Sequence, residues 1–314
     1  MQTCNTSHDV LNEIELNEEL FAPMAFGTEA ESVRYEKSVW WRMWHALKEN
    51  KLAMLCLVLL GIIILASVLA PLSPYDPDAL DFIHKLQLPS KEHPFGTDEM
   101  GRDQFTRALY GGRISLTVAF CAMLISIAAG TLVGTISGYV GGKLDAVIMR
   151  GIDILMSVPS FLLIVVLNAF LSPSLTTLIL VIALFGWMSV ARIVRAETLS
   201  LKERDFVLAS KGLGAGSFTI IFQHIIPNTM SSVIVAASLS IAKAILTESS
   251  LSFLGFGVQL PLSSWGSMLQ SAQLYILDRP TLAVFPGILI LITVLSFNIL
   301  GDTLRTALEP KQMK

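Results

Sequence analysis

The sequence predicts an all-α membrane protein with six transmembrane helices and a short cytoplasmic helix between the fourth and fifth of them. The first observation is composition: 53% of the 314 residues are hydrophobic and 15% are charged, against about 25% charged in ordinary soluble domains. The second is a set of long uncharged runs. The third is one polar, glycine-rich interruption at residues 204–228. With a mean hydropathy of +0.64, the chain is suited to a bilayer rather than to one water-soluble core.

The six spans follow from the uncharged runs. A bilayer core about 30 Å thick needs roughly 20 apolar residues per helix. The run at residues 154–191 is too long for one helix, and "LSPS" at residues 171–174 divides it into a third and a fourth span. The remaining spans are expected at residues 52–75, 114–142, 218–244 and 280–301.

The uncharged stretch at residues 249–277 has the length of a further span but is rich in Ser, Gly and Gln. Irregular backbone is tolerated at membrane depth only where protein buries it or where it lines a wet cavity. We therefore expect an external, partly re-entrant segment, inside a five-span core at residues 114–303.

The distribution of Lys and Arg sets the orientation, because cytoplasmic segments carry an excess of both. With both termini cytoplasmic, most of these residues lie inside, residues 76–113 form an external segment, and residues 304–314 form a cytoplasmic C-terminus. Residues 1–33 contain no Lys or Arg, which predicts an acidic, disordered tail rather than a secretory leader. Residues 34–51 carry three tryptophans and predict a cytoplasmic helix at the lipid headgroups, with partner docking as the alternative.

The second span carries a ridge of small residues at a spacing of four. On a helix they share one face, where another backbone can approach closely. The pattern predicts tight packing within the chain or with a homologous partner, and the alternative is a role in gating. The ridge consists of Ala122, Ser126, Gly130, Gly134, Gly138 and Gly142.

Motifs for common enzyme chemistry are absent from the sequence. There is no GxxxxGK[ST] phosphate loop, no HExxH and no GxSxG, and the histidines and cysteines are scattered. We therefore expect no catalytic residue, no metal site and no cofactor bound by this chain. Transport is the remaining class.

Three charged residues lie where transport needs polar groups. Asp153 is near the cytoplasmic start of the third span, Lys243 is in the outer half of the fifth, and Glu248 follows it. A charge inside a membrane costs at least about 2.5 kcal/mol and normally faces a bundle interior or cavity. The three are candidates for a translocation pathway. The alternatives are snorkelling for Lys243 and a terminal hydrogen bond for Glu248.

The polar interruption reads "RDFVLASKGLGAGSFTIIFQHIIPN". Residues 204–213 predict a short helix whose apolar side comes from residues 206–208. Gly214 and Gly216 are expected to end it in left-handed geometry, and Pro227 to bend the start of the fifth span. Such a helix suits a partner's groove, and the alternative is an amphipathic loop at the interface.

This stretch resembles the cytoplasmic "EAA" loop of ABC importer permeases. Ala209, Gly214 and Pro227 match the pattern, as does Ile226, while Leu208 stands where the family has Glu. Ser210 replaces the second Ala and His224 replaces the usual Ile. The ending "HIIPN" is similar to that of the peptide and nickel branch.

Further blocks extend the resemblance over nearly the whole chain after the tail. They are "HPFGTDEMGRDQFTRALYGGRISL" at 93–116, "LSFLGFGVQLPLSSWGSML" at 251–269 and "FNILGDTLRTALEPK" at 297–311. The sequence is similar to the second, or "C", permease subunit of oligopeptide and dipeptide ABC importers.

The resemblance implies a type I importer permease in a bacterial cell membrane, embedded in lipid and without a nucleic-acid partner. It implies a second homologous permease, two ATP-binding subunits that hold ATP and Mg²⁺, and an external substrate-binding protein. The coupling residues it implies are Asp205, Phe206, Ala209, Ser210, Gly214, His224 and Pro227. The alternatives are import of nickel complexes or another small solute, and a secondary transporter, although no internal repeat supports the latter.

Overall fold

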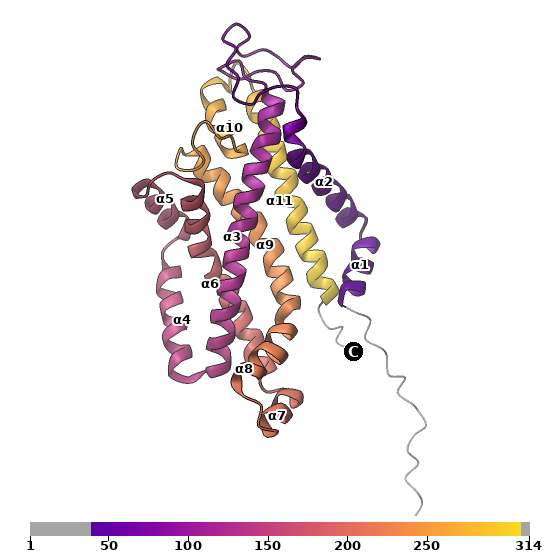
Figure 1. The fold of residues 1–314 in the computed structure, drawn as a ribbon, viewed down its shortest axis with the longest axis vertical. Helices are drawn as coiled ribbons and strands as arrows, with labels where there is room; N and C mark the ends of the chain where they lie inside the picture. Colours follow the sequence, from indigo (N-terminus) through magenta and orange to yellow (C-terminus); the bar gives the residue numbers. More distant parts are fainter. Residues whose placement is uncertain (1–38, 309–314) are drawn as a thin grey trace, which may run out of the picture. The chain divides into compact units, whose positions relative to one another are not determined.

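The computed structural model describes residues 39–308, and over these residues the fold is helical (Figure 1). The predicted tail 1–33, the first residues of the predicted interfacial helix and residues 309–314 lie outside the described part. The principal α-helices are α1 Val39–Glu49, α2 Lys51–Val68, α3 Gln104–Val140, α4 Gly142–Ser157, α5 Ser160–Phe170, α6 Leu175–Leu201, α7 Asp205–Gly212, α8 Ser217–Thr219, α9 Ile226–Phe253, α10 Trp265–Ala272 and α11 Thr281–Leu308.

Among residues 39–308, five helical segments are long and apolar enough to cross a membrane, and a sixth arises if α4 and α5 count as one span. These two helices meet at a 79° bend. Val158 at the break has extended backbone angles, because the residue before Pro159 is disfavoured in helical geometry. The all-helical fold is as predicted, whereas the break inside the third span was not foreseen.

Several helices differ in length from the predicted spans. α2 ends at Val68, before the expected residue 75, and a 3₁₀ turn containing Pro71 follows. α3 begins at Gln104, well outside the predicted start at residue 114, because Asp103 caps it by accepting a hydrogen bond from the Thr106 N–H. Uncharged runs locate the apolar part of a helix and miss turns that carry charge.

The expected re-entrant segment at 249–277 is partly regular. α9 continues to Phe253, beyond the predicted end of the fifth span at residue 244. α10 then begins after Ser264, which forms a reciprocal capping box with Ser267. Figure 1 places α10 at one end of the bundle and α7 at the opposite end.

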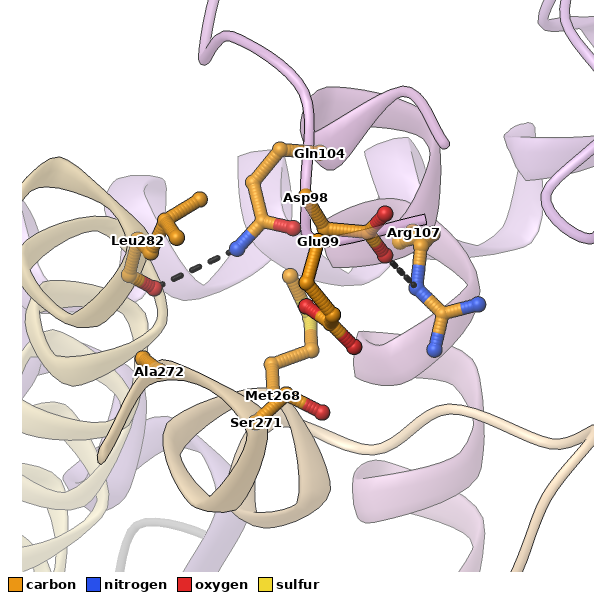
Figure 2. Close-up of a pocket in the computed structure, with 8 residues that line it drawn as sticks. All are labelled: Asp98, Glu99, Gln104, Arg107, Met268, Ser271, Ala272 and Leu282. Atoms are coloured by element: carbon orange, nitrogen blue, oxygen red, sulfur yellow. Dashed lines mark hydrogen bonds and ion pairs between the residues drawn. The ribbon is translucent and has the colours of Figure 1, made fainter. Parts of the chain in front are cut away.

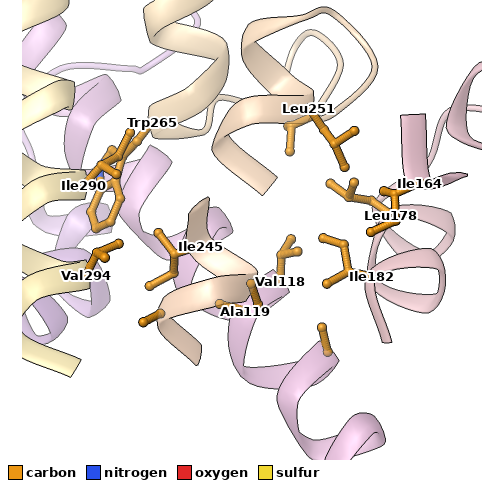
Figure 3. Close-up of a cluster of buried hydrophobic side chains, with 14 of the residues drawn as sticks. Val118, Ala119, Ile164, Leu178, Ile182, Ile245, Leu251, Trp265, Ile290 and Val294 are labelled. Carbon is orange, nitrogen blue, oxygen red and sulfur yellow. The ribbon is translucent and has the colours of Figure 1, made fainter. Parts of the chain in front are cut away.

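The main apolar core joins α3, α5, α6, α9, α10 and α11 near the α10 end (Figure 3). Val118 and Ile245 are fully buried in it, and Trp265 is 1% exposed. The indole Nε1–H of Trp265 donates to the Ala108 carbonyl at 3.0 Å, which satisfies its polar atom. This core fixes α10 on α3.

The small-residue ridge of α3 packs on α6, the most extensive helix contact of the described chain. A Cβ atom at Gly134 would stand 2.5 Å from the Ala191 carbonyl oxygen, and one at Gly130 would stand 2.6 Å from Val190 Cβ. Packing within the chain is therefore confirmed for these positions. Gly142 is the first residue of α4, and a Cβ atom there would meet no atom of another residue within 4 Å, so it does not belong to the contact.

Candidate functional site

The helix α7 lies at the position of the predicted coupling helix, and its C-terminus is built by glycine. Gly214 has a φ of +85°. The Ala215 N–H donates to the Ser210 carbonyl at 3.1 Å, and the Gly214 N–H donates to the Lys211 carbonyl at 3.0 Å. These bonds form a Schellman stop. The prediction for Gly214 is confirmed. The prediction for Gly216 is wrong, because its φ of −68° makes it the residue that precedes α8.

One apolar side chain holds α7 against the bundle. Val207 is 2% exposed and packs with Ile220 and Ile225 of the π-helical turn Ile220–Ile225 that precedes α9. Tyr139 at the end of α3 packs against the same cluster. The expected apolar side at 206–208 is therefore divided, with only its middle residue buried.

A polar contact supplies the second attachment. His224 Nε2 and Ser210 Oγ lie 3.2 Å apart, and the His224 ring stands 6.1 Å from that of Phe206. The structure thus brings together three residues that the sequence proposed for one site. Pro227 has no backbone N–H to donate. The turn before it is a π-helix, and the Ile226 N–H donates a hydrogen bond to the Ile221 carbonyl.

The outward face of α7 and the following turn is apolar and uncovered. Phe206 is 43% exposed, Leu213 90% and Phe218 74%, and the Phe218 ring lies 4.4 Å from that of Phe222. Asp205, Ala209 and Pro227 are also exposed. Five of the seven predicted coupling residues are exposed: Asp205, Phe206, Ala209, Gly214 and Pro227.

The pathway candidates have different surroundings. Lys243 on α9 lines a cavity of about 110 Å³ between α3, α5, α6 and α9. Asp153 on α4 lies outside this cavity and forms an ion pair with Arg192 on α6 at 2.5 Å. The sequence reading did not anticipate this partner, which lies 39 residues away.

Glu248 lies in a cage of serine hydroxyls and has no exposed surface. Its carboxylate accepts hydrogen bonds from Ser252 at 2.7 Å and from Ser115 of α3 at 2.9 Å. The Ser115 hydroxyl also accepts a hydrogen bond from the backbone N–H of Trp265 at 3.3 Å, so the cage links α3, α9 and α10. This arrangement extends the terminal hydrogen bond considered from sequence, and Glu248 reaches no open cavity in this conformation.

At the α10 end, charged residues of the segment 76–113 are buried and paired (Figure 2). Asp98 accepts from Arg102 Nε at 2.7 Å and lies 3.5 Å from Arg107 Nε. Gln104 Nε2 donates to the Leu282 carbonyl at 3.2 Å and so ties α3 to α11. The sequence analysis did not predict these pairs.

Comparison with known proteins defines the class. Residues 130–314 match the family described as binding-protein-dependent transport system inner membrane component. Residues 38–89 match the N-terminal TM domain of oligopeptide transport permease C. The chain therefore belongs to the binding-protein-dependent transport permeases, membrane proteins with several spans that work within a multi-subunit transporter, and not to the enzymes.

Curated relatives narrow the resemblance. The oligopeptide transport system permease protein OppC of Bacillus subtilis is 40% identical over 94% of this chain and 98% of its own length. The dipeptide transport system permease protein DppC of the same organism is 43% identical over 85% of this chain and 84% of its own. The oligopeptide transport system permease protein OppC of Haemophilus influenzae is 40% identical over 88% of this chain and 89% of its own length.

Solved structures agree on the fold. A chain of the MetNI methionine ABC transporter in an inward-facing crystal form aligns with a TM-score of 0.54 at 20% identity. The alignment covers 64% of this chain and 96% of that one. The permease fold of ABC importers is thereby confirmed. The family match at residues 130–314, and not the structural likeness, argues against the secondary-transporter alternative.

Proposed function

We propose that this chain forms half of the membrane pathway of an ATP-driven importer of oligopeptides or dipeptides in a bacterial cell membrane. The peptide substrate is supported by the names of its relatives, which cover most of both chains. The proposed partners are a second homologous permease, two ATP-binding subunits that hold ATP and Mg²⁺, and an external binding protein.

The single observation that supports this assembly is the exposed apolar face of α7. A helix of eight residues with only Val207 buried makes few contacts with its own chain, while Phe206 and Leu213 stand uncovered. Exposed aromatic and aliphatic side chains next to charged ones are typical of protein interfaces. We assign this face to the ATP-binding subunits, which places α7 and both termini in the cytoplasm.

The contacts of α7 supply a route for motion. Val207 packs on the π-helical turn, and Ser210 contacts His224 within it. A partner that shifts α7 therefore displaces the start of α9, whose Lys243 lines the cavity. In this proposal, closure of the ATP-binding subunits is converted into alternating access through α9.

Purification of the tagged chain from its native host in mild detergent tests the assembly. Two ATP-binding proteins and a second permease are expected to co-purify. Recovery of the chain alone, under conditions that keep other membrane complexes intact, contradicts the proposal.

The role of α7 is tested by Phe206→Asp, which puts a charge on the exposed face. We expect co-purification of the ATP-binding subunits to fall at least tenfold while the second permease is retained. Thr306→Asp, at an exposed position near the end of α11, is the matched control. Undiminished recovery of ATP-binding subunits with Phe206→Asp argues against docking on this face.

A further inference from the structure

The cavity beside Lys243 is rich in hydrogen-bond donors. Its polar lining includes the Lys243 ammonium and the hydroxyls of Ser160 and Ser240, and no carboxylate lines it. Within residues 39–308, none of these three groups has a side-chain hydrogen bond or ion pair to another residue. Ser160 is also the first residue of α5, so its backbone N–H has no acceptor inside the helix.

Other hydroxyls of the same cavity are already used as donors. The Ser126 hydroxyl donates to the Ala183 backbone carbonyl, and the Ser189 hydroxyl donates to that of Gly186. The Thr247 hydroxyl donates to the backbone carbonyl of Lys243. Their oxygens remain acceptors that help to hold water. The donors still available therefore concentrate around Lys243, Ser160 and Ser240.

Lys243 lies within a helical segment that is long and apolar enough to cross the membrane. Lys243 lies ten residues before the end of α9 at Phe253, about 15 Å along the helix at 1.5 Å per residue. A cation at membrane depth normally has a partner, and the described chain supplies none. Lys243 is exposed and faces the open pocket, so an anion from outside this chain can supply the counter-charge.

The size of the cavity limits what enters it. A water molecule needs about 10–15 Å³ by the same kind of measure, so 110 Å³ holds a small polar group with some water. The pocket is open on one side, so one end of a peptide can enter it while the rest stays outside. The aromatic rings of Phe161 and Phe185 line the same space and offer an apolar wall next to the donors.

We propose that Lys243, together with Ser160 and Ser240, binds the C-terminal carboxylate of the peptide during its passage. This inference rests on the peptide-import function proposed above. A free C-terminal carboxylate is common to all such peptides whatever their side chains. The site therefore recognises the class of substrate and leaves its sequence open.

The first experiment uses the complete importer in lipid vesicles with its binding protein. Uptake of alanine peptides of two to five residues is compared with uptake of their C-terminal amides, for wild type and Lys243→Met. Each rate is expressed relative to wild type with the same peptide, which cancels the preference of the binding protein. We expect at least a fivefold loss for the free acids, restored by Lys243→Arg, and less than a twofold change for the amides.

Two controls separate the outcomes. Lys51→Met makes the same chemical change at an exposed position at the start of α2 and is expected to transport both peptides normally. Equal loss for acids and amides with Lys243→Met overturns the proposal, because it indicates a structural role. Wild-type vesicles that take up neither peptide contradict the peptide-import function instead.

A second measurement identifies the anion directly. During turnover, a water-soluble carbodiimide activates carboxylates, and a contacting lysine amine then forms an amide that mass spectrometry can locate. We expect the isotope-labelled free peptide on Lys243, and none with the amide or with Lys243→Met. If wild-type vesicles transport no amide, this result decides alone. A lipid carboxylate or an acidic residue of a partner on Lys243, with no peptide, overturns the proposal.

Discussion

The two ends of the bundle are built in different ways. At the α10 end, Asp98, Arg102 and Arg107 are buried and paired with one another, and Gln104 binds the neighbouring α11. At the other end, α7 buries one side chain and has one side-chain hydrogen bond, from Ser210 to His224 or the reverse. The α10 end is closed by the chain's own contacts, whereas α7 has few contacts with the rest of the chain and, in the proposed assembly, gains others from the ATP-binding subunits.

The largest effect is expected from Asp98→Ala at the α10 end. The substitution leaves the buried guanidinium groups of Arg102 and Arg107 without their shared partner. Breaking a buried ion pair on one side typically costs about 3–5 kcal/mol. We expect a large fall in the thermal unfolding midpoint in detergent and poor recovery of folded protein.

Glu92→Ala is the matched control for this change, because Glu92 belongs to the same segment but is exposed. It is expected to leave the midpoint within error of wild type. Equal midpoints for the two variants argue that the α10 end is no more rigid than the α7 end.

A smaller loss is expected from Gly134→Leu, at the contact between α3 and α6 that joins the two ends. A Cβ atom there meets the Ala191 backbone, which cannot rotate away. Overpacking of this kind costs about 1–3 kcal/mol. The same change at Gly61 of α2 is expected to be tolerated, because a Cβ atom there would meet no atom of another residue within 4 Å. Comparison of unfolding midpoints of the two variants checks this, and equal losses speak against close packing on α6.

The smallest change in stability is expected from Gly214→Val at the end of α7. A side chain there meets no atom within 4 Å, so the cost is backbone strain at φ +85°, about 1–2 kcal/mol. We expect folded protein in normal amounts, with a fall in the peptide transported per ATP hydrolysed. Gly212→Val, in ordinary helical geometry with equally open space, is the control. Wild-type coupling in Gly214→Val contradicts the importance of this helix stop.

The sequence predicted most of the helices because the two features used, long uncharged runs and a glycine at the end of a helix, depend only on residues close together in the chain. α7 and its stop at Gly214 agree with the expectation, since both depend on neighbouring residues. The bend at Val158 was missed although Pro159 was visible, because a proline also occurs inside continuous helices such as α11 at Pro286. Only packing decides which proline breaks its helix.

The candidate site was predictable to a lesser degree. Phe206, Ser210 and His224 were chosen by family resemblance, and the structure shows that they are close together. The serine cage of Glu248 could not be foreseen, because Ser115 lies 133 residues away along the chain. The donors facing Lys243 likewise come from α5 and α9, which no local pattern connects.

The length of α3 has a mechanical consequence. Its 37 residues span about 55 Å at 1.5 Å per residue, and it carries Arg107 near one end and Tyr139, beside Val207, near the other. If a straight rod of that length is held at the α10 end, a tilt of about 5° moves its other end by about 5 Å. A small angular change of α3 at the α10 end would therefore displace the residues on which α7 packs by several ångströms.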